Sequence, residues 1–477
     1  MINQSISSGK VPRIFKQALV KPLIKKPTLD AENLQNYRPV ANLSFISKVL
    51  ERIIANQLHV YLEKNDLHER MQSAYRPKHS TETALLKIQN DVLLSLDKGN
   101  EVILVFLDLS AAFDTIDHFL LLERLRNRYG LTGLAWDWIK SYLENREQYV
   151  VINDKRSSAS TTSFGVPQGS VLGPILFILY TAPLGDIIRA HGMEHTLYAD
   201  DTQLYISVKP SGHVAAAGKI EACLKDIRLW MQQNKLKLND SKTELLHATS
   251  KHKVSEVFPS VSIGESKSNP VAKVCNLGVI LDKNFTMTDH IHHVTKTASH
   301  HIWKIGKIRK MLDRKSTETL VHAFVTSRLD YCNSLLIGLP SHLIKQLQRI
   351  QNTAARVVTK TKKFDHVSHI MRDLHWLPVR DRIVYKVLIL TFKALHGEAP
   401  NYISNMVIRY VPPRNLRSSS KNQLEVPKVK TKLYGERAFA AASPNLWNSL
   451  PKNITYCDDM NVFKSMLKTF LFSNAYK

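Results

Sequence analysis

The sequence is poor in cysteine and in long apolar runs. Its four cysteines lie far apart, at Cys223, Cys275, Cys332 and Cys457. The absence of a C-x-x-C pair argues against a zinc knuckle or ribbon and favours a reduced intracellular chain. The longest apolar run, residues 171–184, is interrupted by glycine and proline and is shorter than the roughly 20 residues that cross a bilayer. The polar first ten residues contain no apolar signal core, so we expect no membrane association.

Acidic residues are also scarce. The 477 residues include 41 Asp and Glu against 66 Lys and Arg, which gives a formal net charge of +25 and an isoelectric point near 9.7. Such an excess favours a polyanionic partner, because each neutralised phosphate releases condensed counterions. A basic membrane-surface protein would need an amphipathic anchor or a lipidation signal, and the sequence shows neither. The composition, 44% apolar and 22% charged, is that of a globular chain long enough for two or three packed units.

Hydrophobic periodicity predicts both helices and strands. Helices are predicted at residues 44–63, 81–97, 120–128, 135–143, 171–180 and 219–234. Strands are predicted at residues 101–108 and 149–154, in a hairpin at 196–208, and near residues 245 and 277–281. The run at 101–108 is continuously apolar and ends in an acid, which is typical of a strand buried on both faces. Residues 1–30 indicate a basic, extended lead-in, and beyond residue 285 the chain becomes basic and mainly helical to about residue 395.

Three acids stand where predicted strands end. Asp108 follows the buried run, and Asp200 and Asp201 form the tip of the predicted hairpin. If these strands are neighbours, the three carboxylates converge and repel one another unless cations lie between them. Two Mg²⁺ ions about 3.5–4 Å apart, which clamp the attacking and leaving oxygens of a phosphoryl displacement, are the usual solution. An Asp-Asp pair in a turn is weak evidence when taken alone, because turns favour aspartate.

The segments around these acids are more specific. Three of them occur in order along the chain: FLDLSAAFD at 106–114, GVPQGSVLGP at 165–174 and YADD at 198–201. This series resembles the palm motifs A, B and C of reverse transcriptases, most closely those of non-LTR (LINE-type) retrotransposons. Four flanking segments are similar to that family's fingers motifs and motifs D and E: NYRPVAN at 36–42, QSAYRP at 72–77, LNDSKTE at 238–244 and LGVILD at 277–282. The resemblance covers about residues 15–285.

The resemblance implies an α+β fold of the right-hand polymerase type, with fingers, a palm built on an antiparallel sheet, a thumb, and a mainly helical C-terminal extension. We therefore expect four regions: lead-in and fingers at 1–100, palm at 101–285, a basic helical thumb at 286–395 and the extension at 396–477. Lysines and arginines between 295 and 314 suit the phosphates of a primer–template duplex, or else form a solvated helix face. The five histidines between 290 and 301 do not have the spacing of a zinc site.

The resemblance also implies roles for single residues of the palm. Asp108 and Asp200 would be the principal metal ligands, and Asp201 would support the metal site less directly. Phe113 stands where the family places the aromatic ring that excludes a 2′-hydroxyl and so selects deoxynucleotides; a core phenylalanine is the alternative. Asp114 is expected to make a structural hydrogen bond or to cap a helix.

Five further residues are candidates for substrate binding. Gln168 and Gly169 lie in the segment that the family uses to hold the nucleotide and the template base, although Gln168 could instead stabilise a turn. Arg76 and Arg38 could clamp the triphosphate through bidentate bonds, or be surface residues. Lys242 could donate a proton to the departing pyrophosphate, or be a solvated lysine.

The sequence therefore predicts an RNA-directed DNA polymerase, a nucleotidyltransferase that uses Mg²⁺, with Mn²⁺ as a substitute. The implied partners are an RNA template, a DNA primer or nicked target DNA, and dNTPs; no protein partner is indicated. The resemblance implies an intracellular location, in a cytoplasmic ribonucleoprotein and in the nucleus. Such elements usually place an endonuclease before the polymerase, and here the chain begins almost at the fingers motifs, so we expect a 5′-truncated copy. The alternative is a catalytically silent, nucleic-acid-binding remnant of such an element.

Overall fold

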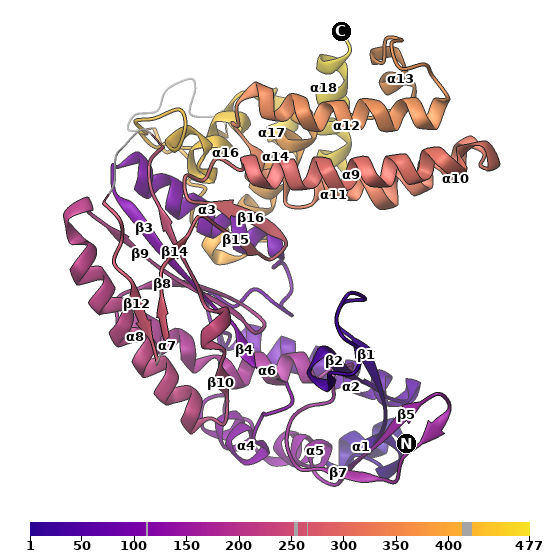
Figure 1. Cartoon of the computed structure of the whole chain (residues 1–477), viewed down its shortest axis with the longest axis vertical. Helices are drawn as coiled ribbons and strands as arrows, with labels where there is room; N and C mark the ends of the chain where they lie inside the picture. Colours follow the sequence, from indigo (N-terminus) through magenta and orange to yellow (C-terminus); the bar gives the residue numbers. More distant parts are fainter. Residues whose placement is uncertain (111–112, 252–255, 265, 413–421) are drawn as a thin grey trace.

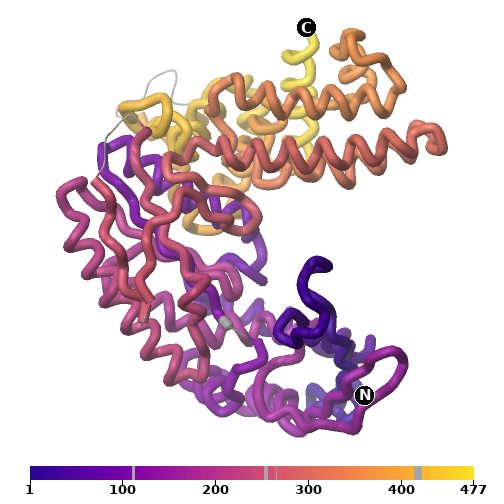
Figure 2. Tube along the Cα trace, in the orientation of Figure 1, coloured from indigo at the N-terminus to yellow at the C-terminus, as the bar shows by residue number. Residues whose placement is uncertain are grey.

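The structure is a computed structural model that describes residues 1–110, 113–251, 256–264, 266–412 and 422–477. Ala111 and Ala112 of the predicted motif A, and part of the Pro- and Ser-rich stretch after Tyr410, lie outside these ranges. The chain forms an open arc (Figures 1 and 2). The N-terminal elements lie at one end of the arc, a central sheet lies in its middle, and the helices after residue 288 form the other arm.

The central sheet has five strands. In spatial order they are β14 (Pro270–Val271), β11 (Glu244–Ala248), β3 (Glu101–Leu107), β9 (Asp201–Val208) and β8 (Glu194–Tyr198). Every residue of β3 is buried, and successive residues alternate between two separate cores. One core receives Val102, Leu104 and Phe106, and the other receives Ile103, Val105 and Leu107. The prediction of a strand with two buried faces is confirmed, because side chains alternate across the pleat.

One apolar cluster joins one face of this sheet to several helices of the N-terminal half of the chain. They are α2 (Phe45–Lys64), α4 (His118–Asn127), α5 (Gly133–Leu143), α6 (Gly173–Thr181), α7 (Pro183–Ala190) and α8 (His213–Gln233). The segment Gly173–Ala190 is long and apolar enough for a membrane span, but 67% of it is buried inside the protein, as in core helices. Helix α8 begins well before the predicted residue 219, because Ala216 and Ala217 extend its buried stripe although both side chains are small.

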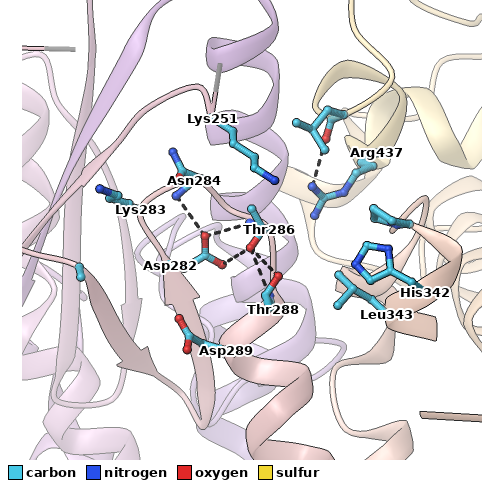
Figure 3. Close-up of a pocket in the computed structure, with 13 residues that line it drawn as sticks. Lys251, Asp282, Lys283, Asn284, Thr286, Thr288, Asp289, His342, Leu343 and Arg437 are labelled. Carbon is cyan, nitrogen blue, oxygen red and sulfur yellow. Dashed lines mark hydrogen bonds between the residues drawn. The ribbon is translucent and has the colours of Figure 1, made fainter. Parts of the chain in front are cut away.

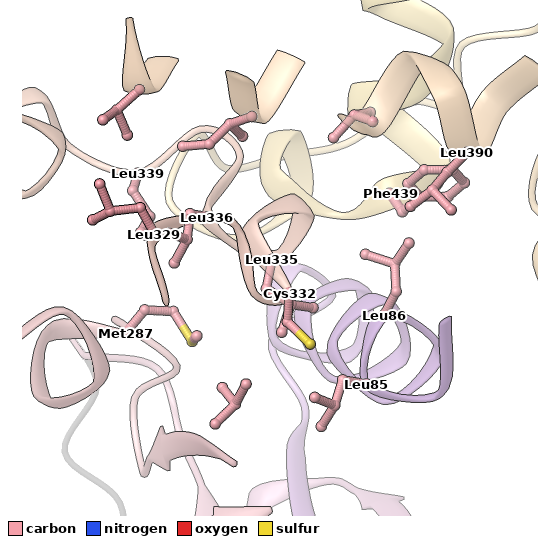
Figure 4. Packing of buried hydrophobic residues seen from close by; sticks show 14 of the residues in the cluster. Leu85, Leu86, Met287, Leu329, Cys332, Leu335, Leu336, Leu339, Leu390 and Phe439 are labelled. Carbon is pink, nitrogen blue, oxygen red and sulfur yellow. The ribbon is translucent and has the colours of Figure 1, made fainter. Parts of the chain in front are cut away.

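Helix α3 (Thr81–Asp97) and the C-terminal helices cover the opposite face. The bounds of α3 are those predicted, and it begins with a capping box in which the side chains of Ser80 and Thr83 each bind the other residue's backbone N–H. Leu85 and Leu86 of α3 lie beside residues from the chain beyond 285 (Figure 4). One apolar cluster therefore runs without interruption from the palm sheet into the C-terminal helices, and the expected region boundaries stay a prediction.

A second sheet lies at the N-terminal end of the arc. Its strands are β2 (Tyr37–Asn42), β1 (Gln17–Ile24), β5 (Arg146–Ile152), β6 (Lys155–Arg156) and β7 (Ser160–Thr162). The prediction of an extended lead-in over residues 1–30 is wrong, because helix α1 (Ile2–Ser8) packs on α5 and β1 pairs with both β2 and β5. Pro22 had indicated a break. It lies within β1, beyond the residues that pair with β5, so its missing N–H removes no ladder bond on that side.

The second arm is helical, as predicted. Its helices are α9 (Thr288–Ile308), α10 (Arg314–Val321), α11 (Ser327–Asp330), α12 (Ser341–Thr359), α13 (Ser368–Asp373), α14 (Val379–Leu395), α15 (Asn401–Ser404), α16 (Phe439–Asn448), α17 (Lys452–Thr455) and α18 (Met460–Ala475). The hairpin of β15 (Lys273–Asn276) and β16 (Val279–Asp282) leads into α9. Arg437, only 1% exposed, donates a hydrogen bond to the carbonyl of Phe285, which ties the C-terminal segment to this connection. Figure 3 shows Arg437, which also donates to the carbonyl of Leu433.

Candidate active site

The three predicted acids meet at one edge of the central sheet. Asp108 directly follows β3, Asp200 lies in the two-residue turn between β8 and β9, and Asp201 begins β9. Because β3 and β9 are antiparallel neighbours with Leu107 opposite Thr202, Asp108 comes beside the turn. The predicted convergence of strand ends is therefore what the register of this sheet produces.

The turn itself is held from the fingers side by Gln72. This side chain is 2% exposed, and its Oε1 accepts the backbone N–H of Ala199 at 3.2 Å and of Ala74 at 2.9 Å. Ala199 has a φ of +58°, a left-handed conformation that is uncommon for alanine, so the turn needs such support. Sequence reasoning gave Gln72 no role, although it belongs to the QSAYRP segment quoted for the resemblance.

The carboxylates of the turn are electrostatically crowded. Burial raises the pKa of Asp200, and the nearby charge of Asp108 raises it further, while the charge of Arg38 opposes the increase. Burial, together with the charges of Asp200 and Asp108, raises the pKa of Asp201 to about 6. A proton or a cation among the three carboxylates would relieve this repulsion. An all-oxygen donor set of this kind fits Mg²⁺ or Mn²⁺.

Asp108 is held from the other side by the predicted motif D. The backbone N–H of Asn239 donates to the Asp108 carbonyl at 2.9 Å, and its side-chain amide donates to Oδ2 at 3.1 Å. Nζ of Lys242 lies 3.4 Å from the same Oδ2. The contact follows from a short antiparallel pair, β10 (Lys237–Leu238) with β4 (Leu109–Ser110), that brings the two segments together. Asn239 is a second residue for which the sequence suggested no role.

Phe113 is half-buried beside the core of the helical face. Its ring stacks on that of Phe177 in α6, with centroids 4.6 Å apart and planes 27° apart. The backbone N–H of Val166 donates to the Phe113 carbonyl at 2.9 Å, which fixes motif A to motif B. The ring is thus supported underneath while part of it stays accessible, an arrangement compatible with both of its predicted roles.

Motif B is pinned between the fingers and motif A. The side-chain amide of Gln168 donates to both carboxylate oxygens of Asp114, at 2.9 and 2.8 Å. The Gln168 carbonyl accepts the backbone N–H of Ala41 in β2 at 2.7 Å. Gly169 has a φ of +113°, and a Cβ there would lie 2.6 Å from the Ala41 carbonyl oxygen, so only glycine fits. In this arrangement Gln168 stabilises the turn, and Asp114 makes the structural hydrogen bond predicted for it.

The two predicted arginines have different surroundings. Arg38 is exposed on β2 and close enough for its charge to act on Asp200. Arg76 is half-buried, and its guanidinium donates to the carbonyls of Glu69 and Gln72, at 2.8 and 3.0 Å. The structure therefore shows Arg76 bracing the loop that carries Gln72. Its neighbour Tyr75 has a φ of +56° and is 46% exposed. Partial burial and the charge of Asp200 raise the pKa of the Tyr75 hydroxyl.

A hollow of about 120 Å³ opens beside the carboxylates. It is lined by residues of motifs A, C, D and E, among them Asp108, Asp201, Lys242, Gln203 and Asn276. Gln203 of β9 donates to the side-chain carbonyl of Asn276 at 2.9 Å, so the hairpin of β15 and β16 is attached to β9. The larger hollow of Figure 3, near Arg437, contains none of the three carboxylates of the sheet edge.

The chain belongs to the family described as reverse transcriptase (RNA-dependent DNA polymerase), which matches residues 24–281. It is 28% identical over 384 residues to the probable RNA-directed DNA polymerase from transposon BS of Drosophila melanogaster. It is 29% identical over 369 residues to that of the X-element of the same species. These alignments cover 78% and 76% of this chain but only 41% and 40% of the relatives, so the chain spans about two fifths of their length. The resemblance to non-LTR retrotransposon enzymes is confirmed.

Solved structures of telomerase match this chain at low identity and low TM-score. Apo telomerase from Candida tropicalis is 10% identical with a TM-score of 0.43, and the alignment covers 77% of this chain and 63% of that one. Telomerase from Candida albicans is 13% identical with a TM-score of 0.38, covering 81% of this chain and 65% of that one. The assignment to the polymerase fold rests on the family match and on the sheet described above.

Proposed function

We propose that this chain copies RNA into DNA by two-metal nucleotidyl transfer from dNTPs. The observation that carries the proposal is the meeting of Asp108 with Asp200 and Asp201 at adjacent strand ends, inside a family-matched palm. Three carboxylates at one sheet edge, with raised pKa values on the turn, form a site that a pair of divalent cations would complete.

Asp108 and Asp200 would hold the two Mg²⁺ ions, with Asp201 in support and Mn²⁺ as a substitute. When bound, the ions supply Lewis-acid stabilisation of the attacking 3′-oxygen, the transferring phosphoryl group and the leaving pyrophosphate. Asn239 fixes the rotamer of Asp108, and Gln72 fixes the turn that carries Asp200. Lys242, whose Nζ lies 3.4 Å from Oδ2 of Asp108, would give a proton to the departing pyrophosphate.

The sugar and the triphosphate would be selected by the surrounding loops. Phe113, supported by Phe177, presents a rigid ring against a 2′-hydroxyl. To contact the nucleotide, Gln168 would exchange its hydrogen bonds with Asp114 for bonds to the substrate. Gly169 lets the backbone of β2 approach closely enough to form the floor of the nucleotide site. Arg38 is the better placed of the two arginines for the triphosphate, because the guanidinium of Arg76 is engaged with backbone carbonyls.

The template and primer would lie along the inner side of the arc. On α9 the side chains of Lys296, Lys304 and Lys307 are exposed, as is Trp303, and they suit phosphate and base contacts. Arg309 is a different case, because its guanidinium donates to the carbonyls of Val357 and Val358 and so caps α12. We propose an RNA template, a DNA primer or nicked target DNA as partners, and action in a cytoplasmic ribonucleoprotein and in the nucleus.

Primer extension tests the proposal directly. The purified chain, an oligonucleotide-primed RNA template, dNTPs and Mg²⁺ should give complementary DNA. Asp108→Ala and Asp200→Ala should each lower the rate by about a thousand-fold or more, because a metal ligand supports several kcal/mol of transition-state stabilisation. Asp458→Ala is the matched control, since the Asp458 side chain is 96% exposed and lies outside the palm.

Two outcomes would contradict the proposal. Product formation by Asp200→Ala at the wild-type rate would remove the site assignment. Primer–template binding without any extension by the intact chain, in Mg²⁺ and in Mn²⁺, would identify it instead as a catalytically silent nucleic-acid-binding remnant.

A further inference from the structure

A buried cluster of three side chains lies at the opposite end of β3 from Asp108. Glu101 is the first residue of β3, His213 is the first residue of α8, and His247 lies in β11. They are 1%, 6% and 8% exposed, respectively. The two histidines are 112 and 146 positions from Glu101 in the sequence, so no local motif connects them.

All three side chains meet on the face of the sheet that α8 covers. In β3 the side chain of Glu101 lies on the same face as those of Ile103 and Val105, which belong to that core. His247 of β11 pairs with Ile103 in the neighbouring strand. Nε2 of His213 lies 2.8 Å from Oε2 of Glu101, and Nε2 of His247 lies 2.7 Å from the same oxygen. The two imidazole planes are 85° apart and the ring centroids are 5.2 Å apart. Each ring therefore points its own Nε2 at Oε2 of Glu101 from a different side.

Phe258 closes the cluster from outside the sheet. Its ring is 1% exposed, and its centroid lies 5.5 Å from that of each imidazole. It precedes β12 (Val261–Ile263), which packs on α8. A hydrophobic wall around nitrogen and carboxylate ligands limits solvent access and strengthens the ligand–cation attraction.

We propose that Glu101, His213 and His247 form a binding site for a structural Zn²⁺ ion. Two imidazole nitrogens and a carboxylate oxygen are a recognised zinc donor set, whereas Mg²⁺ prefers oxygen alone. The candidate ligand atoms of the three residues all lie within 4.8 Å of one another. Zinc ligands at about 2.0–2.1 Å in tetrahedral geometry stand roughly 3.3–3.4 Å apart, so the present contacts need to open by only about half an ångström.

The proposed ion would be distinct from those of polymerisation. Glu101 begins the seven-residue strand β3 and Asp108 directly follows it, which puts the two sites about 20 Å or more apart along the strand. An ion held by β3, β11 and the first residue of α8 would tie together three elements that are distant in the sequence. Its contribution would therefore be to stability, and the inference does not depend on catalytic activity.

Metal content and stability test the proposal on the full chain. Protein purified without chelator, then passed through Mg²⁺-containing buffer, should contain one zinc per chain by mass spectrometry. Co²⁺ added to stripped protein should give the visible absorption of a tetrahedral nitrogen–oxygen site. Zn²⁺ at about 100 times its dissociation constant should raise the unfolding midpoint of stripped protein by about 3 °C.

Variants separate this cluster from the histidine-rich surface of α9. Glu101→Gln keeps a hydrogen-bonding side chain and should fold, yet lose both the zinc and the thermal shift; His213→Ala should do the same. His292→Ala with His293→Ala, exposed on α9, should keep one zinc per chain. Zinc that is lost in the α9 variant and kept in Glu101→Gln would overturn the proposal. Wild-type protein without zinc, Co²⁺ absorption or thermal shift would also overturn the proposal and would leave the cluster as a glutamate hydrogen-bonded to two imidazoles.

Discussion

Nζ of Lys242 lies 3.4 Å from Oδ2 of Asp108, so the candidate proton donor and a candidate metal ligand are in direct contact. The side chain of Lys242 is 67% exposed, which leaves it free to move toward a leaving group. The ammonium partly neutralises the carboxylate of Asp108. During the reaction it would have to exchange this contact for the pyrophosphate.

Replacement of this lysine should separate the two roles. Lys242→Ala should lower the maximal rate of nucleotide addition by about 10²-fold, within the range of a lost general acid, with little change in the dNTP KM. The Mg²⁺ concentration for half-maximal activity should fall, because a competing cation has been removed from Asp108. Single-nucleotide incorporation kinetics over a Mg²⁺ titration measures both effects, with Lys468→Ala of α18 as the control. An unchanged rate would identify Lys242 as a solvated lysine.

Phe113 should control sugar selection. Phe113→Val removes the ring that stacks on Phe177 and opens room beside the ribose, so ribonucleotide incorporation relative to deoxynucleotide should rise by about 10-fold or more. Competition between matched rNTP and dNTP in primer extension measures the ratio. Phe119→Val on the exposed side of α4 is the control, since Phe119 is 71% exposed. A loss of stability with unchanged selectivity would make Phe113 a core residue only.

Gln72 should matter for activity although it is remote from the sequence motif of the acids. Gln72→Ala leaves the backbone N–H groups of Ala199 and Ala74 without their acceptor, at a cost of about 1–3 kcal/mol. We expect a lower unfolding midpoint and a fall in polymerisation rate, because the Asp200 turn loses its support. Gln232→Ala, an exposed change at the end of α8, should do neither. Wild-type activity in folded Gln72→Ala would show that the turn holds its conformation unaided.

The stability of the fingers–palm junction should depend on pH through Glu69. Burial alone would raise the pKa of this carboxyl, but hydrogen bonds and charge from His195 and Arg189 hold it at about 2, against an ordinary value of 4.5. A depressed folded-state pKa contributes stability that is fully present above about pH 4.5 and is lost as the pH falls toward 2. The shift corresponds to about 3 kcal/mol at neutral pH.

Urea unfolding of wild type and Glu69→Gln checks this expectation. The difference in unfolding free energy should be constant from pH 7 to 5 and should shrink between pH 4.5 and the lowest pH at which the wild type folds. Glu123→Gln on α4 is a control, since it contacts neither His195 nor Arg189. A difference that stays constant down to that lowest pH would exclude the assigned cause.

Local sequence patterns were sufficient to predict those helices and strands whose signal lies within the segment itself. The strand in the run at 101–108 could be recognised as doubly buried because residues 102–107 are all apolar, and hydrophobic periodicity predicted the bounds of α3. The order of the motifs located Asp108, Asp200 and Asp201, and the sheet register then placed them together. β1 was missed, because its pairing with β5 joins segments about 130 residues apart and Pro22 mimics a break.

The side chains that hold the site in place were beyond the reach of such patterns. Arg76 either faces a triphosphate or braces a loop, depending on where the carbonyls of Glu69 and Gln72 lie. The spacing of residues in the sequence does not give the positions of these carbonyls. Asn239 was undetectable as a partner of Asp108 for the same reason. The cluster of Glu101 with two histidines is the extreme case, since its members meet only after β3, β11 and α8 have packed. Residue type and order thus predicted which carboxylates meet at the edge of the palm sheet. The side chains that support these carboxylates come from contacts that form only once distant segments are brought together.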